Sequence, residues 1–96
     1  MIKLVATDLD DTLLNDEWKI SRNNIEAVRL AVAKGVIVTL ATGRMAASCR
    51  KYARELGLDV PIITYQGALI ERGLGGETLY KKTVSSELAA EIVEIL

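Results

Sequence analysis

Short apolar segments alternate with amphipathic ones along this chain. The apolar segments are Ile2–Thr7, Val36–Ala41 and Ile62–Tyr65, and the middle one is continuous and β-branched, as in a strand covered on both faces. Between them, apolar residues recur every three or four positions, which is typical of the buried side of a helix. The order strand, helix, strand, helix, strand predicts an α/β fold with a parallel sheet and right-handed crossovers.

The two predicted helices have recognisable starts and ends. Ser21 is a suitable N-cap for the first helix, and Gly35 stands where a left-handed residue would end it. Gly57 would end the second helix. The apolar positions that mark these helices are Ile25, Val28 and Val32 in the first, and Met45, Cys49, Tyr52, Ala53 and Leu56 in the second.

The remaining segments predict smaller elements. Leu13–Ile20 mixes polar and apolar side chains, which indicates a loop or a small hairpin. Leu69–Glu71 and Thr78–Lys82 flank a glycine-rich turn, and this pattern favours a hairpin. Ser85 would cap a last helix that carries leucine and isoleucine on one stripe.

A polar break follows each of the three predicted parallel strands. These breaks are Asp8–Thr12, Thr42–Arg44 and Gln66–Ala68. In parallel α/β sheets the ligand site lies beyond the carboxyl ends of the strands. We therefore expect the three breaks to line one edge of the sheet and to form the functional site.

The first break places two aspartates two positions apart. If the carboxylates of Asp8 and Asp10 face one small volume, a cation or a shared proton must relieve their repulsion. Carboxylate oxygens are ligands that Mg²⁺ prefers, and a carboxylate is also a nucleophile that can form an aspartyl-phosphate. The alternative is that both aspartates are solvated loop residues, and composition alone does not decide between the two.

The other two breaks carry weaker indications. Thr42 and Gly43 offer a hydroxyl and an accessible backbone N–H ahead of a helix start, a combination that suits a phosphoryl group, although an ordinary turn has the same pattern. Arg44 would contact an anion or lie exposed to solvent. Gln66–Ala68 gives a weaker indication still, because its glycine would serve only a tight turn.

Composition narrows the classes of function. The 96 residues are 50% hydrophobic and 26% charged with a net charge of −1, which is typical of one soluble globular domain and excludes disorder. We expect no nucleic-acid partner and no membrane partner, because the chain has no basic excess and no apolar segment near the ~20 residues of a membrane helix. The chain has no histidine, which excludes Ser-His-Asp and Cys-His catalysis and imidazole zinc sites. The single cysteine, Cys49, excludes an intramolecular disulfide and fits a reducing cytoplasm.

Together the motifs resemble those of the haloacid dehalogenase-like (HAD) phosphatase superfamily. The segment Asp8-Leu9-Asp10-Asp11-Thr12 resembles its D-x-D-x-[TV] first motif, and Ala41-Thr42-Gly43-Arg44 resembles its second motif. The T-G-R form is similar to the Cof-like phosphatases, whose third strand usually runs into Asn-Gly-Ala, whereas this chain has Gln66 in place of the asparagine. The resemblance implies the N-terminal half of a three-layer, Rossmann-like α/β core with a parallel sheet. Residues 1–82 would form the partial core with its hairpin, and residues 83–96 would begin the α/β cap.

The resemblance also implies a role for each motif residue. Asp8 would be the nucleophile and a magnesium ligand. Asp10 would be the acid–base residue, and its backbone carbonyl would bind the same Mg²⁺. Thr42 would hydrogen-bond the phosphoryl oxygens of a small phosphorylated metabolite. Gly43 and the backbone amides of Leu9 and Asp10 would complete the phosphate-binding site. Arg44 belongs to the same substrate-binding group.

Two further motifs of the family, a lysine and an acidic G-D-x-x-N-D segment, do not occur in the chain. The family's strand order would also leave the first strand as an open edge that invites pairing with another chain. We therefore expect a truncated enzyme and keep three hypotheses. The chain carries the nucleophile half of a magnesium-dependent phosphatase, or it is a non-catalytic domain that self-associates through the open sheet edge as a homo-oligomer, or it is a phospho-acceptor module.

Overall fold

The computed structural model describes residues 1–96 and contains short strands and helices in alternation. The strands are β1 (Leu4–Thr7), β2 (Ile37–Leu40), β3 (Pro61–Thr64), β4 (Leu69–Arg72) and β5 (Thr78–Lys81). The helices are α1 (Arg22–Ala33), α2 (Ala46–Leu56) and α3 (Ser86–Ile95), with a π-helical turn η1 (Leu9–Leu13) and a 3₁₀ turn η2 (Tyr65–Gly67).

The strands lie in the spatial order β1-β2-β3-β4-β5. Strands β1 and β2 pair in parallel from Leu4 opposite Ile37 to Thr7 opposite Leu40. A single parallel bridge between Ala41 and Ile63 joins the end of β2 to β3, and β3, β4 and β5 continue as an antiparallel ladder. The predicted α/β fold with parallel pairing is confirmed. Because β1 pairs only with β2, it is a free edge.

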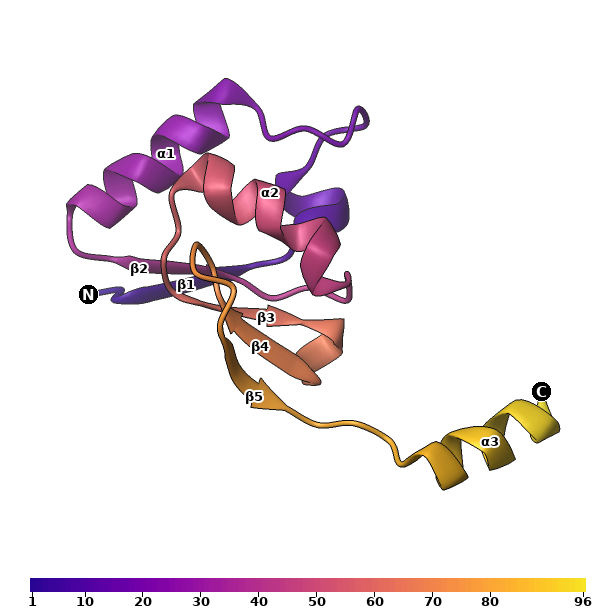
Figure 1. Ribbon diagram of the computed structural model, residues 1–96. Helices are drawn as coiled ribbons and strands as arrows, with labels where there is room; N and C mark the ends of the chain where they lie inside the picture. The colour runs from indigo at the N-terminus through magenta and orange to yellow at the C-terminus, as the bar shows by residue number, and fades with distance from the viewer.

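Both α1 and α2 cover the same side of β1 and β2 (Figure 1). The predicted caps are present: Ser21 Oγ accepts a hydrogen bond from the Asn24 backbone N–H at 3.2 Å, and Gly57 ends α2 with a left-handed φ of 69°. The other side of the two strands has no helix on it. There Leu4 and Ile37, which are paired in register, keep 58% and 52% of their surface exposed.

The core lies between the sheet and the two helices. Its buried apolar residues are Leu9, Leu14, Ile20, Val38, Leu40, Cys49, Tyr52, Ala53, Leu56, Leu58 and Ile62. The predicted apolar side of α2 is therefore confirmed from Cys49 to Leu56. The bidentate contact of Arg50 with Glu71, at 2.9 and 3.2 Å, ties the exposed side of this helix to β4.

Two expected core positions are wrong. Met45 is 57% exposed because the helix begins after it, so that its side chain belongs to the preceding loop. Val32 is 44% exposed because it lines an open recess together with Gly57 and Leu58. Ile25 and Val28, the other expected positions of α1, do pack against the core.

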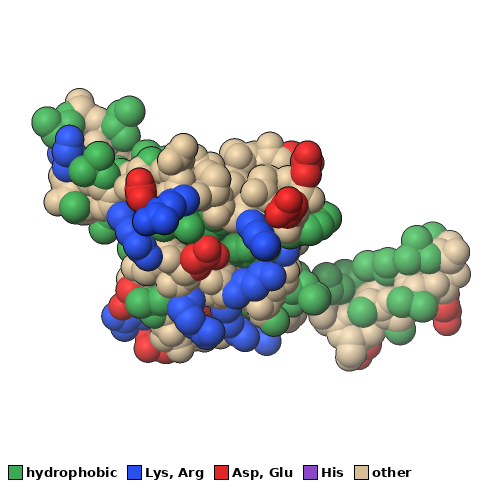
Figure 2. Space-filling view, turned by 90° about the horizontal axis from the view of Figure 1, so that it is seen from above, with side chains coloured by type: hydrophobic (Ala, Val, Ile, Leu, Met, Phe, Trp, Pro, Cys, Tyr) green, Lys and Arg blue, Asp and Glu red, His purple; other side chains and the backbone are tan.

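The smaller predicted elements are also present. An antiparallel bridge between Leu14 and Ile20 makes residues 14–20 a small hairpin, and β4 and β5 form the second hairpin. The last helix, α3, extends away from the rest of the molecule, and Figure 2 shows hydrophobic side chains along this protruding arm. None of the helices combines the length and the hydropathy that a membrane crossing requires.

Candidate active site

The first polar loop is built around one buried leucine. After β1 the backbone stays extended through Asp8 and then turns, and the Leu9 side chain is 0% exposed. The Leu14 N–H donates to the Leu9 carbonyl at 2.9 Å and closes the turn, while Asp11 adopts a left-handed φ of 60°. Asp8 and Asp10 therefore flank a residue, Leu9, whose side chain is fixed in the core.

The second and third loops are joined by backbone hydrogen bonds. The Tyr65 N–H donates to the Arg44 carbonyl at 3.0 Å, and the Gln66 N–H donates to the Thr42 carbonyl at 3.1 Å. A methyl group added at Gly43 would lie 2.6 Å from Gln66 Nε2, so that the Gln66 side chain lies directly against this glycine. Sequence reasoning missed this contact, because it joins two loops that are far apart in the sequence.

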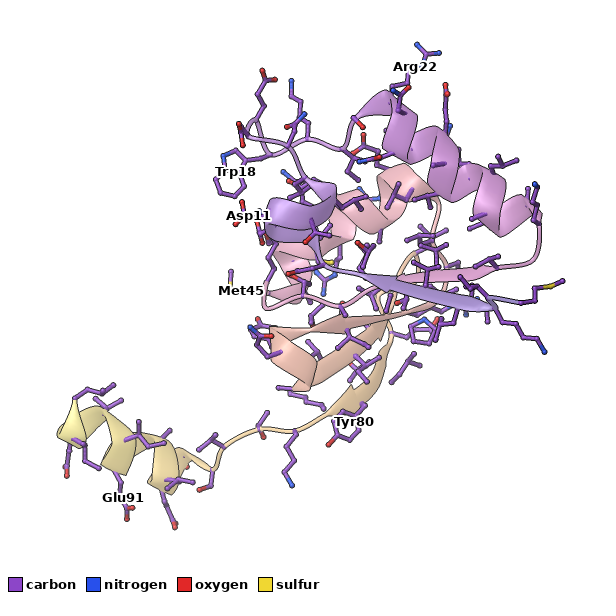
Figure 3. All side chains as sticks on the ribbon, turned by 180° about the vertical axis from the view of Figure 1, so that it is seen from behind. Asp11, Trp18, Arg22, Met45, Tyr80 and Glu91 are labelled. Atoms are coloured by element: carbon purple, nitrogen blue, oxygen red, sulfur yellow. The ribbon has the colours of Figure 1, made fainter.

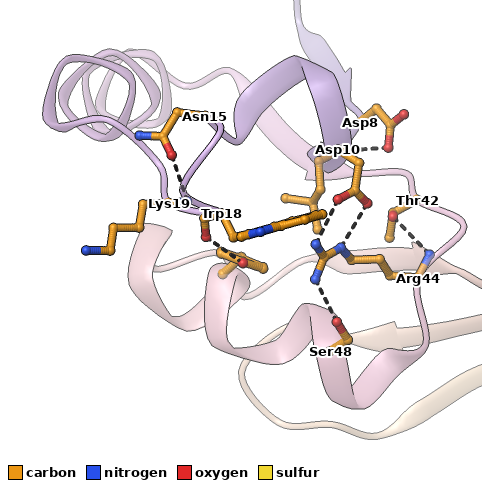
Figure 4. Close-up of polar contacts among 10 residues, drawn as sticks. Asp8, Asp10, Asn15, Trp18, Lys19, Thr42, Arg44 and Ser48 are labelled. Carbon is orange, nitrogen blue, oxygen red and sulfur yellow. Dashed lines mark hydrogen bonds and ion pairs between the residues drawn. The ribbon is translucent and has the colours of Figure 1, made fainter.

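Arg44 joins the second loop to the first. Its Nε and Nη2 donate to the two carboxylate oxygens of Asp10 at 2.9 and 2.7 Å, and its Nη1 donates to Ser48 Oγ at 2.8 Å (Figure 4). The backbone N–H of Arg44 donates to Thr42 Oγ1 at 3.0 Å. The expected convergence of the three loops at one edge of the sheet is therefore confirmed.

This ion pair changes the electrostatics of Asp10. Hydrogen bonds from Arg44 lower the pKa of Asp10 below its ordinary value, and they outweigh the opposite effect of partial burial. The hydrogen bonds to Asp10 likewise raise the pKa of Arg44. The structure therefore holds Asp10 as a carboxylate bound by a cation.

Two aromatic rings lie beside the Arg44 guanidinium. Its Cζ is 5.5 Å from the centre of the Trp18 ring and 5.5 Å from the centre of the Tyr52 ring. The Tyr52 hydroxyl donates to the Trp18 backbone carbonyl at 2.8 Å. Spacing had placed Tyr52 in the core and Trp18 in a loop, and no pattern in the sequence indicated that they meet at Arg44.

Asp8 differs from Asp10 in having no cationic partner. One of its carboxylate oxygens accepts the Leu9 N–H at 2.7 Å, and the side chain is exposed at the carboxyl end of β1, near Asp10 and Thr42 (Figure 4). Figure 3 shows Asp11, Trp18 and Met45 along the same end of the molecule, far from Glu91 of α3.

The other predicted substrate-binding residues also lie at this edge. Thr42 is 4% exposed, and its hydroxyl faces the Arg44 N–H. The Leu9 amide is bonded to Asp8, and the Arg44 side chain is bonded to Asp10 and Ser48. The roles of Leu9, Thr42, Gly43 and Arg44 toward a substrate stay predictions.

The donors that this edge offers to a metal are oxygen atoms. The Asp8 carboxylate and the Asp10 backbone carbonyl are of the kind that Mg²⁺ binds, together with water and substrate phosphate. The chain contains no group of three or more acidic, cysteine or histidine side chains arranged to hold a metal. The residues present therefore fit part of a magnesium shell.

Comparison with known proteins gives a consistent result. The sequence profile of the haloacid dehalogenase-like hydrolases matches residues 5–96. The 5-amino-6-(5-phospho-D-ribitylamino)uracil phosphatase YcsE of Bacillus subtilis is 49% identical over 69 residues, which are 72% of this chain and 28% of YcsE.

Solved structures share the fold. A haloacid dehalogenase-like hydrolase from Bacteroides thetaiotaomicron superimposes with a TM-score of 0.86 at 29% identity, over 98% of this chain and 36% of that protein. A HAD/Cof-like hydrolase from Plasmodium vivax gives a TM-score of 0.77 at 27% identity, over 99% of this chain and 36% of that protein. The chain thus spans about a third of the length of these relatives, and it belongs to the Cof-like group of the haloacid dehalogenase-like hydrolases.

Proposed function

We propose that this chain carries the nucleophile-bearing part of a magnesium-dependent phosphatase that hydrolyses small phosphate monoesters. Asp8 is the proposed nucleophile and Asp10 the proposed acid–base residue. The observation that carries the proposal is the contrast between the two aspartates at one strand end. Asp8 is exposed and free of cations, whereas Asp10 is bound on both oxygens by Arg44.

The proposed reaction has two steps. In the first, an Asp8 carboxylate oxygen bonds to phosphorus while the bond from phosphorus to the ester oxygen breaks, and the ester oxygen takes the proton of the Asp10 carboxyl. In the second, Asp10 takes a proton from water, whose oxygen bonds to phosphorus as the bond to Asp8 breaks. Inorganic phosphate leaves, and both aspartates return to their initial states.

Asp10 must change its surroundings to act as the acid. Because Arg44 lowers the pKa of Asp10, the paired group is a carboxylate and has no proton to donate. The proposed mechanism therefore includes a turn of the Asp10 side chain from Arg44 to the ester oxygen when substrate binds, and Asp10 takes up a proton from solvent once it has left Arg44. Thr42, Gly43 and the Leu9 amide would orient the phosphoryl group during this exchange.

Mg²⁺ would be held by the Asp8 carboxylate and the Asp10 backbone carbonyl. When bound, it would offset the negative charge that gathers between the phosphoryl group and Asp8.

The proposed substrates are small phosphorylated metabolites, such as sugar phosphates. YcsE is a 5-amino-6-(5-phospho-D-ribitylamino)uracil phosphatase, so this compound is a specific candidate for the assay. We also propose that the protein acts in the cytoplasm, since its single cysteine is a free thiol. Residues 83–96 are proposed to begin a separate cap, which agrees with the way α3 extends from the body (Figure 1).

The test is turnover of p-nitrophenyl phosphate with Mg²⁺ by the wild-type chain and by Asp8→Asn. We expect release of p-nitrophenol by the wild type and background rates in the variant. A matched control is Asp11→Asn, since Asp11 makes no ion pair, and we expect it to keep the wild-type rate. Background rates in all three proteins would refute the phosphatase proposal for this chain. A stable aspartyl-phosphate without turnover would favour the phospho-acceptor hypothesis.

The free edge of the sheet supports a second candidate function, self-association. Strand β1 has an unpaired side, and Leu4 and Ile37 expose apolar surface on the face that no helix covers. Pairing of two β1 edges would satisfy the backbone groups and bury these side chains. Sedimentation at several concentrations tests this. A dimer that dissociates in Leu4→Lys supports self-association, and a monomer at all concentrations contradicts it.

A further inference from the structure

Trp18 makes two independent contacts with the residues around Asp10. Its ring lies 5.5 Å from the Arg44 guanidinium carbon, a distance at which a cation is attracted to the face of an indole. Its backbone carbonyl accepts the hydroxyl proton of Tyr52, whose own ring lies 5.5 Å from the same guanidinium carbon. Trp18, Arg44 and Tyr52 thus form a closed set of contacts.

The small hairpin over residues 14–20 is built to present Trp18. Leu14 and Ile20 bridge its base and are buried, and Asn15 Oδ1 accepts the N–H groups of Glu17 and Lys19 at 2.9 and 3.1 Å. One asparagine side chain therefore bridges the two sides of the loop. The buried base and these hydrogen bonds hold the loop in one conformation, which fixes where the indole begins.

The backbone at Trp18 is strained. Its φ of 63° lies in the left-handed region, which bulky residues rarely adopt, and 62% of its surface is exposed. Burial of the indole therefore does not account for this conformation. The hairpin turn sets this conformation: the Trp18 N–H donates to the Asn15 carbonyl at 3.0 Å and the Asn15 N–H donates to the Lys19 carbonyl at 2.9 Å, the pattern of a β-turn followed by a left-handed residue. The turn thereby fixes the backbone from which the indole reaches Arg44.

We propose that Trp18 is a positioning residue for Asp10. The indole and the Tyr52 ring restrict the position of the Arg44 guanidinium. Ser48 Oγ accepts a hydrogen bond from Nη1, which leaves Nε and Nη2 to donate to the two carboxylate oxygens of Asp10. The hairpin thereby sets where the Asp10 carboxyl rests before it turns to a substrate. The effect on catalysis rests on the proposed function. The coupling between Trp18 and Asp10 does not, because it can be measured in the absence of any turnover.

The coupling has a direct spectroscopic test, because Trp18 is the single tryptophan of the chain. Acrylamide quenching of its fluorescence is compared in the wild type, Asp10→Asn and Asp11→Asn. Loss of the Asp10 charge frees Arg44 and loosens the indole, so that the quenching constant rises in Asp10→Asn. The neighbouring variant removes the same charge without touching Arg44 and keeps the wild-type constant. Equal constants in the two variants overturn the proposal.

The catalytic consequence is tested with Trp18→Ala and Trp18→Phe on p-nitrophenyl phosphate. A cation–aromatic contact at an exposed site corresponds to a shift of about two- to fivefold in the population of the confined state. Because the Asp10–Arg44 pair must open before Asp10 acts, we expect kcat of Trp18→Ala to rise about two- to fivefold with KM unchanged, and kcat of Trp18→Phe to return most of the way to the wild-type value. A raised KM with unchanged kcat would place the indole on the substrate and overturn the positioning role.

The two proposals fail in different ways. If the wild type shows no turnover but the quenching constant distinguishes Asp10→Asn from Asp11→Asn, the phosphatase proposal fails and the positioning of Asp10 by Trp18 stands. If turnover is present and Trp18→Ala matches the wild type in kcat and KM, the phosphatase proposal stands and the positioning role is refuted.

Discussion

Leu9 joins the fold to the candidate active site, since its side chain lies in the core between the two aspartates. The side chain is 0% exposed, so Leu9→Ala would leave a cavity inside closed packing. Leucine-to-alanine changes at such positions cost about 2–5 kcal/mol of unfolding free energy. A domain of this size has only about 5–15 kcal/mol in total, and each lost kcal/mol lowers Tm by about 4–8 °C. We therefore expect Tm to fall by about 8 °C or more.

The assay is thermal and urea unfolding, each followed by far-UV circular dichroism, with Leu30→Ala as the matched control. Leu30 is on α1 and is 58% exposed, so the same change there should alter the unfolding free energy by less than about 0.5 kcal/mol. An unchanged slope of the unfolding free energy against urea concentration would show that the surface exposed on unfolding is the same in the variant and the wild type. Equal costs for the two variants would refute the reasoning that a buried Leu9 anchors the aspartate turn.

Three other predictions concern single residues. Burial raises the pKa of the Cys49 thiol to about 11, so labelling by iodoacetamide at pH 8, followed by mass spectrometry, should be slow in the folded chain and fast in urea. Hydrogen bonds from Arg72 lower the pKa of Asp59 below its ordinary 3.8, so this pair stabilises the fold above that pH and its contribution is lost as the pH falls through the lowered value. Acid titration of Asp59→Asn should accordingly show a smaller loss of stability than the wild type. Gly73→Ala would place a methyl group against the Leu58 backbone carbonyl, and thermal unfolding should show destabilisation of about 1–3 kcal/mol.

Local features of the fold could be read from the sequence. The strand and helix order, the Ser21 cap, the left-handed Gly57 and the hairpin of β4 and β5 all depend on residues that are close together in the chain. The position of the site was predictable for a related reason. Parallel strands present their carboxyl ends at one edge, so the order of the elements was enough to bring the three polar loops together.

Contacts within the site were not predictable in the same way. Asp10 and Arg44 are 34 residues apart, and so are Trp18 and Tyr52, and nothing in local spacing selects these partners. Met45 and Val32 show the same limit for packing, because helical periodicity gives the apolar side of a helix but not where the helix begins or what lies above it.

The sequence by itself therefore determined the order and type of the elements, the edge at which the candidate chemistry gathers and the residue types available for it, because these follow from hydrogen bonding and steric preference over a few residues. Only the tertiary structure decided that Arg44 binds Asp10 and leaves Asp8 free, and that Trp18 meets Arg44. Those contacts depend on how η1, α2 and the hairpin of residues 14–20 pack against one another, and long-range packing sets that geometry.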